Sequence, residues 1–106
     1  MFARSVSMKL KTNDAAEFTR TINDEVIPLL RKQKGFLEEI VLAVPGKTEV
    51  LGISLWDRKE SAETYNRDTY PQVQKALAKV LDGTPLVKTY DVTNSTFHKA
   101  AAHASA

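Results

Sequence analysis

The hydrophobic pattern of this chain changes period along its length, and the order of these periods limits the fold more than any other feature. Apolar and polar residues alternate over residues 2–10, which is typical of a strand with one buried face. From Phe18 to Leu30 apolar residues recur every three or four positions, as on one side of an amphipathic helix. Pro28 removes a backbone donor from this helix and is expected to kink it near Asp24.

A β-rich hairpin follows the helix, with its two runs joined at Pro45-Gly46. A second helical pattern comes next, and Pro71 is expected to divide it at a bend. The order β-α-β-β-α-β predicts an α+β, ferredoxin-like fold, in which a four-stranded antiparallel sheet has helices on one face. The remaining expected segments are strands 37–44 and 48–56, helices 59–69 and 71–82, and a last strand 86–92.

Alternation also gives an expectation for the sheet face that the helices leave uncovered. On the first strand, Arg4 shares the helix-facing side with the large apolar residues. The uncovered face is expected to be small and half-apolar, with Lys9, Glu39 and Asp91 at its rim. Such a face is unusual on a monomer, so we expect a homodimer in which two sheets pack together. The residues expected on this face are Ala3, Ser5, Ser7, Val41, Ala43, Val50, Gly52, Ser54, Trp56, Val87 and Thr89.

Composition excludes several kinds of chemistry. The 106 residues include no cysteine, and His98 and His103 are both near the end. A thiolate nucleophile, an iron–sulfur cluster and a metal site within the fold are therefore not expected. The net charge of +2 does not indicate a nucleic-acid or membrane partner. No signal peptide or spanning segment is recognised, so we expect a cytoplasmic protein with one domain over residues 1–97 and a tail over residues 98–106.

Several segments resemble the antibiotic biosynthesis monooxygenase (ABM) family of the dimeric α+β barrel superfamily. They are Lys34-Gly35-Phe36, the run 55–65 from the third strand into the next helix, Tyr70-Pro71, and the closing run 87–92. The resemblance extends over residues 2–94. It implies a homodimeric barrel whose ligand lies between the sheet and the helices of each subunit.

Within this family, the resemblance implies chemistry without haem. Haem-degrading relatives carry an asparagine on the first strand, a tryptophan in the second helix and a histidine ligand further on. This chain has Ser5 and Ser7, then Tyr65, then Lys75 near those positions, and a protonated lysine is a poor haem ligand. The resemblance then implies a monooxygenase without cofactor, acting on a small aromatic or quinol-like molecule. Some such relatives have an asparagine where this chain has Gly52.

Arg4 is the most suggestive candidate site residue, because it interrupts an apolar strand face and a buried arginine needs a partner. With Arg4, Trp56 and Tyr65 are the candidate catalytic residues. The candidate substrate-binding residues are Tyr70, Phe18, Ile22 and Val73.

These residues also have structural interpretations. Trp56 can be an anchor of the core or the dimer interface, and tyrosines on helices often pack with their hydroxyls at the rim. The alternative function is a non-catalytic small-molecule-binding or interaction protein of the same fold. This alternative predicts that Arg4 is held in a salt bridge and that the pocket lacks convergent polar groups. The oxygenase predicts a cavity of a few hundred Å³.

Overall fold

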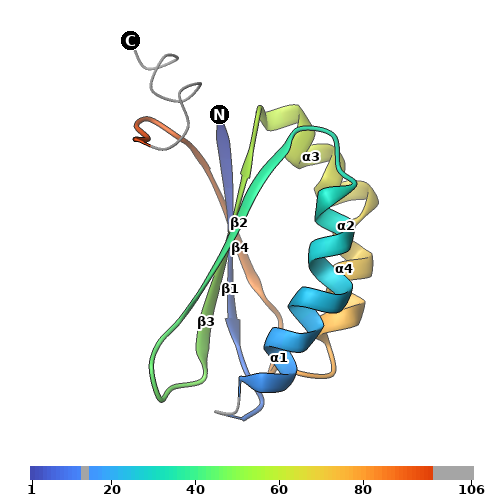
Figure 1. Cartoon of the computed structure of the whole chain (residues 1–106), viewed down its shortest axis with the longest axis vertical. Helices are drawn as coiled ribbons and strands as arrows, with labels where there is room; N and C mark the ends of the chain where they lie inside the picture. Colours follow the sequence, from blue (N-terminus) through green and yellow to red (C-terminus); the bar gives the residue numbers. More distant parts are fainter. Residues whose placement is uncertain (13–14, 97–106) are drawn as a thin grey trace.

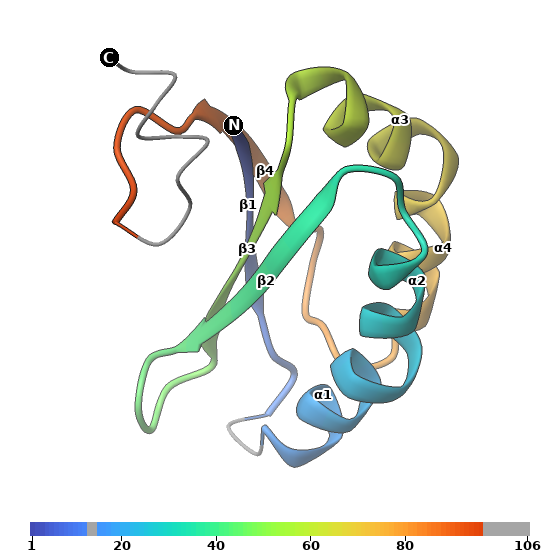
Figure 2. The ribbon, with the colours of Figure 1, turned by 45° about the horizontal axis from the view of Figure 1, so that its top comes forward.

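The computed structural model describes residues 1–12 and 15–96, and the elements follow the expected order. The four strands form one antiparallel sheet in the order β2-β3-β1-β4, and the helices cover one face of it (Figures 1 and 2). The predicted ferredoxin-like α+β fold is therefore confirmed. The predicted tail and both histidines lie outside the described residues. The elements are β1 (Phe2–Lys9), α1 (Ala16–Thr21), η1 (Ile22–Val26), α2 (Ile27–Arg31), β2 (Phe36–Ala43), β3 (Glu49–Trp56), α3 (Lys59–Asp68), α4 (Tyr70–Leu77) and β4 (Leu86–Asp91).

The irregularity expected near Asp24 takes the form of a π-helical turn, η1. Pro28 lacks an N–H, and in an α-helix its ring would clash with the carbonyl of Asp24, four residues earlier. In η1 the N–H of Ile27 donates to the carbonyl of Ile22, five residues earlier. This wider turn lets α1, η1 and α2 follow one continuous helical path through the proline (Figure 1). In the described part of the chain, no helix is long and apolar enough to cross a membrane.

The pairing register corrects the side-chain directions predicted for three strands. Arg4 pairs with Ser54 and Phe2 pairs with Trp56, and directly paired residues share a face of the sheet. Ser54, Trp56 and Val50 therefore face the helices, and their exposed fractions are 4%, 0% and 4%. The expectation that these residues lie on the uncovered face is wrong, and it is also wrong for Val41, Ala43, Gly52, Val87 and Thr89.

The error has a physical cause. Strands β2, β3 and β4 carry apolar residues on both faces, so alternation does not tell which face the core takes, and a one-residue shift reverses the answer. At the start of β2, a register shift between Phe36 and Glu38 reverses the face to which the following side chains point. On β1, the expectation that Ala3, Ser5 and Ser7 face away from the helices agrees with the register.

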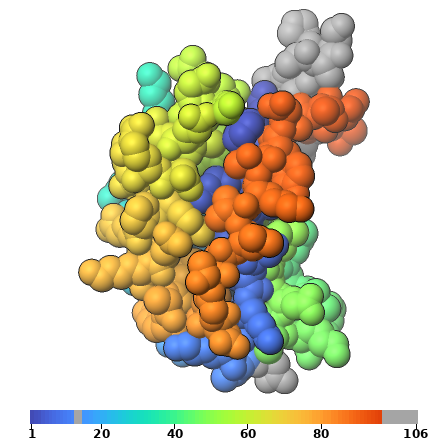
Figure 3. Space-filling view, turned by 180° about the vertical axis from the view of Figure 1, so that it is seen from behind, coloured from blue at the N-terminus to red at the C-terminus, as the bar shows by residue number. Residues whose placement is uncertain are grey.

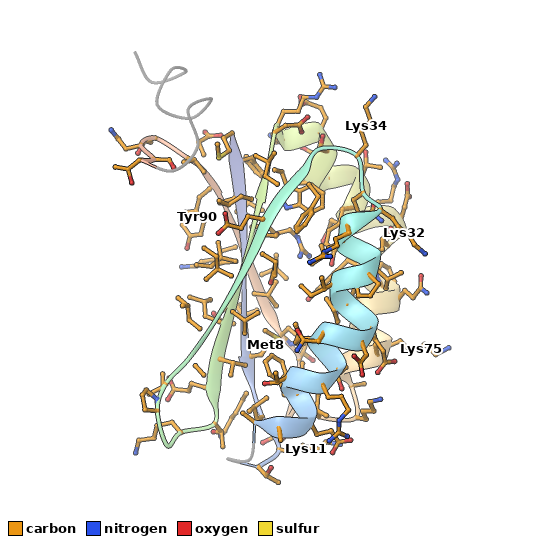
Figure 4. All side chains as sticks on the ribbon, in the orientation of Figure 1. Met8, Lys11, Lys32, Lys34, Lys75 and Tyr90 are labelled. Carbon is orange, nitrogen blue, oxygen red and sulfur yellow. The ribbon has the colours of Figure 1, made fainter. Side chains whose placement is uncertain are left out.

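The uncovered face is consequently more apolar than expected. Leu86, Leu42 and Tyr90 expose 63%, 50% and 49% of their surfaces. Figure 4 shows Tyr90 on the side of the sheet away from the helices, whereas Met8 points between the sheet and the helices. Monomeric proteins rarely leave so many large apolar side chains together in solvent. We call the following set the open face: Ile40, Leu42, Leu51, Ile53, Leu55, Leu86 and Tyr90.

Two adjacent residues of β3 test this assignment of faces. Val50→Asp puts a carboxylate under the helices and is expected to cost about 4 kcal/mol or more, close to the whole stability of a small domain. Leu51→Asp puts the same group on the open face and is expected to leave a folded chain. Circular dichroism and urea unfolding of both variants measure the difference. A folded Val50→Asp protein beside an unfolded Leu51→Asp protein would show the faces to be reversed.

Candidate functional site

One row of paired residues crosses the sheet as a polar line on its helix-facing side. Glu39 of β2 pairs with Ser54 of β3, and Ser54 pairs with Arg4 of β1. Arg4 pairs in turn with Thr89 of β4. We call these four residues the polar row. The rows on either side contain mainly apolar residues, namely Val41, Gly52, Val6 and Val87 on one side and Phe36, Trp56 and Phe2 on the other, where the acid Asp91 stands at the β4 end.

Arg4 is a buried cation with neutral partners. Its side chain and backbone together are only 3% exposed. Its Nη2 donates a hydrogen bond of 2.7 Å to Oδ1 of Asn66 on α3. The guanidinium carbon lies 4.0 Å from the ring centre of Tyr70 and 5.3 Å from that of Tyr65, within cation–π range. Among the described residues, no carboxylate forms an ion pair with Arg4.

Glu39 is the acid on the polar row, and the environment keeps its proton bound. Burial raises the pKa of Glu39 to about 8, although the positive charge of Arg4 acts in the opposite direction. The carboxyl group lies over Gly52, where an added Cβ would be 3.1 Å from Oε2 of Glu39. Gly52 thus leaves room for this side chain between sheet and helices. At neutral pH the row therefore carries the charge of Arg4 with Glu39 mostly neutral.

Trp56 is hydrogen-bonded to Ser54 of the polar row. Its Nε1 donates a hydrogen bond of 2.9 Å to Oγ of Ser54, and this hydroxyl donates to the backbone carbonyl of Arg4 at 3.4 Å. The indole contacts the ring of Phe36 edge-on, with 5.5 Å between centroids, and that of Tyr65 at 5.0 Å. Since Trp56 is fully buried in these contacts, its geometry is that of a residue that holds Ser54 and β1 in place.

Tyr65 of α3 and Tyr70 of α4 cover the polar row from the helix side. Burial raises the pKa of both phenols, and the charge of Arg4 lowers them in part. Both hydroxyls therefore stay protonated near neutral pH. The hydroxyl of Tyr70 is fully buried, and apart from the neighbouring Arg4 guanidinium, which lowers its pKa in part, it meets no hydrogen-bond partner of good geometry among the described residues. An unpaired buried donor of this kind is costly, so this position favours a further polar atom.

Two cavities meet at Arg4. The outer pocket is open to solvent, has a volume of about 410 Å³ and lies between β1, β4 and α3. Figure 3 shows its position, where β1 is visible between α3 and β4. The inner cavity lies under the helices and has a volume of about 30 Å³. The outer pocket has the size of a small-molecule site, whereas the inner cavity has room for about one or two water molecules. The outer pocket is lined by Phe2, Arg4, Lys59, Ala62, Glu63, Asn66, Arg67, Val87 and Thr89.

The structure brings together most, but not all, of the predicted site residues. Arg4, Tyr65, Tyr70, Ile22 and Val73 line the inner cavity, and of these Arg4 alone also lines the outer pocket. Trp56 lines neither cavity. Phe18 is buried beside Leu10 and Val80, away from both cavities.

The sequence analysis placed Glu39 at the rim of the uncovered face, which is wrong because its pairing with Ser54 puts it on the helix-facing side, and it did not single out Asn66. Both look like ordinary surface residues in the sequence, and only the strand register and the helix direction place them beside Arg4. Within residues 1–12 and 15–96, no three side chains of the metal-binding types gather into a cluster.

Comparison with known proteins identifies the fold. A monooxygenase of Streptomyces coelicolor, ActVA-Orf6, solved in complex with the ligand nanaomycin D, aligns with a TM-score of 0.71 at 17% identity, over 84% of each chain. SnoaB, a cofactor-independent oxygenase from Streptomyces nogalater, aligns with a TM-score of 0.73 at 13% identity, over 90% of this chain and 95% of that chain. A candidate antibiotic biosynthesis monooxygenase from Deinococcus radiodurans aligns with a TM-score of 0.71 at 16% identity, over 90% of this chain and 95% of that chain.

No protein-family model matches the sequence, and no curated protein matches it. At these low identities the structural likeness establishes the fold and not the activity. The predicted resemblance is confirmed at that level, because the chain has the fold of ABM proteins.

Substitution of Asn66 tests whether Arg4 lacks a counter-ion. Asn66→Ala removes the 2.7 Å hydrogen bond and is expected to lower the free energy of unfolding by about 1 kcal/mol. Asn66→Asp supplies a carboxylate at the same place and is expected to raise it by about 1 kcal/mol at pH 7. The gain should be present above the ordinary pKa of aspartate, near 4, and should disappear as the pH falls through the lowered pKa of Asp in the folded variant.

Urea unfolding at pH 7 and at pH 3 measures these changes. If the aspartate variant were no more stable than the alanine variant at pH 7, Arg4 would already be compensated by another group.

Proposed function

We propose that this protein is a cofactor-independent monooxygenase that holds a small aromatic or quinol-like molecule in the outer pocket. The observation that supports this proposal is the position of Arg4, a buried cation without an ion-pair partner in the described residues, at the junction of the two cavities. A phenolate or enolate oxygen of the ligand would supply the missing negative charge through charge-assisted hydrogen bonds. The likeness to a monooxygenase that binds nanaomycin D agrees with this choice of ligand.

The walls of the outer pocket suit an aromatic ring with one polar edge. Phe2, Ala62 and Val87 provide apolar surface, and Arg4 and Thr89 provide polar groups next to it. An apolar pocket with a few convergent polar groups is the usual form of a small-molecule site. The ring would lie between β4 and α3 with its ionised oxygen directed at the guanidinium.

The oxidation of a phenol to a quinone balances without any other reactant. Loss of the phenolic proton gives a phenolate, which passes electrons to dioxygen and forms a carbon–oxygen bond at the para carbon. Cleavage of the oxygen–oxygen bond and loss of the hydrogen at that carbon then give the quinone and one water molecule. Arg4 would stabilise the negative charge that develops on the oxygens, a role for preorganised donors in many enzymes.

The alternative is a non-catalytic small-molecule-binding protein of the same fold. It predicts a salt bridge to Arg4, and Arg4 forms none with the described residues. The polar side chains of Arg4, Asn66 and Thr89 also converge on the outer pocket, where the ligand is placed. Both observations favour the oxygenase.

Oxygen uptake with a panel of phenols and hydroquinones of one to three fused rings tests the oxygenase. At least one compound should be consumed with one dioxygen per quinone formed. Arg4→Gln is expected to lower kcat/KM about 100-fold or more, because a main charge-stabilising donor is lost. Arg20→Gln removes an exposed arginine of α1 and should change kcat/KM less than twofold. Tight binding of a panel member by the wild type with no oxygen uptake would instead support the non-catalytic alternative.

We also propose that the protein is a homodimer joined through the open face. The open face is continuous over the neighbouring strands β2 and β3, as the pairs Leu42 and Leu51, and Ile40 and Ile53, illustrate. On β4, Leu86 and Tyr90 belong to the same side of the sheet, beyond the small residues of β1. A stable protein interface usually buries about 800 Å² on each partner. Four strands about 4.8 Å apart and about 25 Å long cover roughly 500 Å² in projection, and their protruding side chains add to this surface.

Sedimentation equilibrium tests this dimer. The wild-type protein should have twice the mass of the chain. Ile53→Asp places a charge on the open face and should give a folded monomer, because an unpaired buried charge strongly opposes association. Lys75→Asp changes the charge on the outer side of the helices (Figure 4) and should leave the dimer intact. A monomeric wild-type protein at 100 µM, about the level at which weak dimers form, would contradict the proposal.

A further inference from the structure

We propose that Glu39 controls the charge balance of Arg4: when protonated it leaves the guanidinium free to bind an anionic ligand in the outer pocket, and when ionised it is a counter-ion that such a ligand displaces as Glu39 takes up a proton. The inference rests on the proposed function only in placing the ligand in the outer pocket. It adds that the ligand binds as an oxyanion, and it names the residue that couples this binding to pH.

The sheet fixes Glu39 and Arg4 on opposite sides of Ser54 in the same polar row. Their side chains both line the inner cavity, but only that of Arg4 reaches the outer pocket. A ligand in the outer pocket therefore approaches the guanidinium from one side while Glu39 lies on the other. The oxyanion of the ligand and the carboxyl group of Glu39 therefore act on the same guanidinium without contacting each other.

The space for Glu39 depends on Gly52. This glycine faces the helices between Val6 and Val41, and any side chain there would press against Oε2 of Glu39. Gly52 therefore leaves the space in which the Glu39 carboxyl group lies between sheet and helices.

The other groups around Glu39 keep their charge as the pH changes. The titratable or charged groups that face it are Arg4 from β1, Tyr65 from α3 and Tyr70 from α4. Both phenols have raised pKa values and remain neutral. The facing residues of β3 are Ser54 and Gly52, which do not titrate, and those of η1 and α2 are the apolar Ile22, Val26 and Leu30. Glu39 is thus the group in this layer that changes its charge near neutral pH.

The coupling follows from the charges. When Glu39 is protonated, Arg4 carries an unbalanced positive charge and attracts an anion. When Glu39 is ionised, it offsets the charge of Arg4 and repels an anion on the far side of the guanidinium. Linkage then requires that anion binding raise the pKa of Glu39 and that Glu39 bind a proton.

The source of the proton depends on the ligand. A ligand that is already ionised requires one proton from solvent for each ionised Glu39. A neutral phenol carries its own proton. Where Glu39 is ionised the phenol can transfer this proton to it, and where Glu39 is already protonated the phenol's proton leaves to solvent. In each case Glu39 ends protonated, and the ligand is bound as the oxyanion that the oxygenase needs.

The sign of the pH effect is fixed. Because burial raises the pKa of Glu39 to about 8, affinity for an anion should be fully present well below pH 8 and should be lost above it. The dissociation constant should rise about tenfold between pH 7 and pH 9, as expected for one coupled proton.

The test uses 2-hydroxy-1,4-naphthoquinone, an acidic compound that is ionised throughout this range, and its neutral 2-methoxy analogue. Titration calorimetry in two buffers of different ionisation enthalpy gives the dissociation constant and the number of protons taken up. The wild-type protein should bind the ionised compound more tightly at pH 7, and should take up about one proton per ligand at pH 9.

Glu39→Gln should abolish both the pH dependence and the proton uptake while keeping the affinity seen at pH 7. Glu38→Gln changes the neighbouring acid on the opposite face of β2 and should behave like the wild type. Gly52→Ala provides a second test that keeps the acid: its methyl group would lie 3.1 Å from Oε2 of Glu39, so the carboxyl group must shift and the pH midpoint of binding should change. An unchanged midpoint in this variant would contradict the role of Glu39.

The outcomes separate the two proposals. Proton uptake that persists in Glu39→Gln, or wild-type affinity that is the same at pH 7 and pH 9, overturns the role of Glu39 and leaves the ligand site at Arg4. Equal affinity for the methoxy compound, or no binding of either compound, overturns the preference for an oxyanion. Undiminished binding of the ionised compound by Arg4→Gln removes the ligand from Arg4 and overturns the proposed function as well.

Discussion

The guanidinium of Arg4, buried against the ring of Tyr70 without an ion-pair partner in the described residues, is the interaction on which the rest of the site depends. A buried cation is normally matched by a carboxylate, because burial without one costs several kcal/mol. Here a hydrogen bond to Asn66 and two aromatic faces replace the carboxylate. These neutral groups hold the charge in place but do not cancel it, so it remains available to a ligand.

The sheet register makes this arrangement possible. It aligns Glu39, Ser54 and Arg4 in one row, and Trp56 fixes Ser54 through the indole N–H. This arrangement lowers the stability of the fold at neutral pH through Glu39, the acid of the polar row. Glu39 keeps its proton in the fold up to about pH 8, whereas in the unfolded chain it loses it near its ordinary pKa of 4.5. Its contribution to stability is therefore full below pH 4.5 and is lost as the pH rises to 8. The fold is less stable at neutral pH for this reason, and the charge of Arg4 remains available to a ligand.

The order of the elements follows from the sequence because its signals are local. The hydrophobic period is two residues in strands and three to four in helices, and Pro45-Gly46 and Pro71 mark breaks between elements. The direction in which the side chains point does not follow from the sequence, because both faces of β3 are apolar. Whether Trp56 or Leu55 faces the helices is decided by the pairing with β1, which no local pattern contains. Arg4 could be found because it breaks an apolar face. Glu39 and Asn66 could not, because their role arises only from what lies opposite them.

The positive charge of Arg4 is unbalanced at neutral pH because Glu39 is protonated. The most direct measurement is a carbon NMR titration of the side-chain carboxyl of Glu39 in the protein without ligand, assigned with the Glu39→Gln variant. A midpoint near pH 8 is expected, in line with the raised pKa. A midpoint at or below the ordinary value of 4.5 would mean that Glu39 is ionised beside Arg4 at neutral pH, and that the charge of Arg4 is already balanced without a ligand.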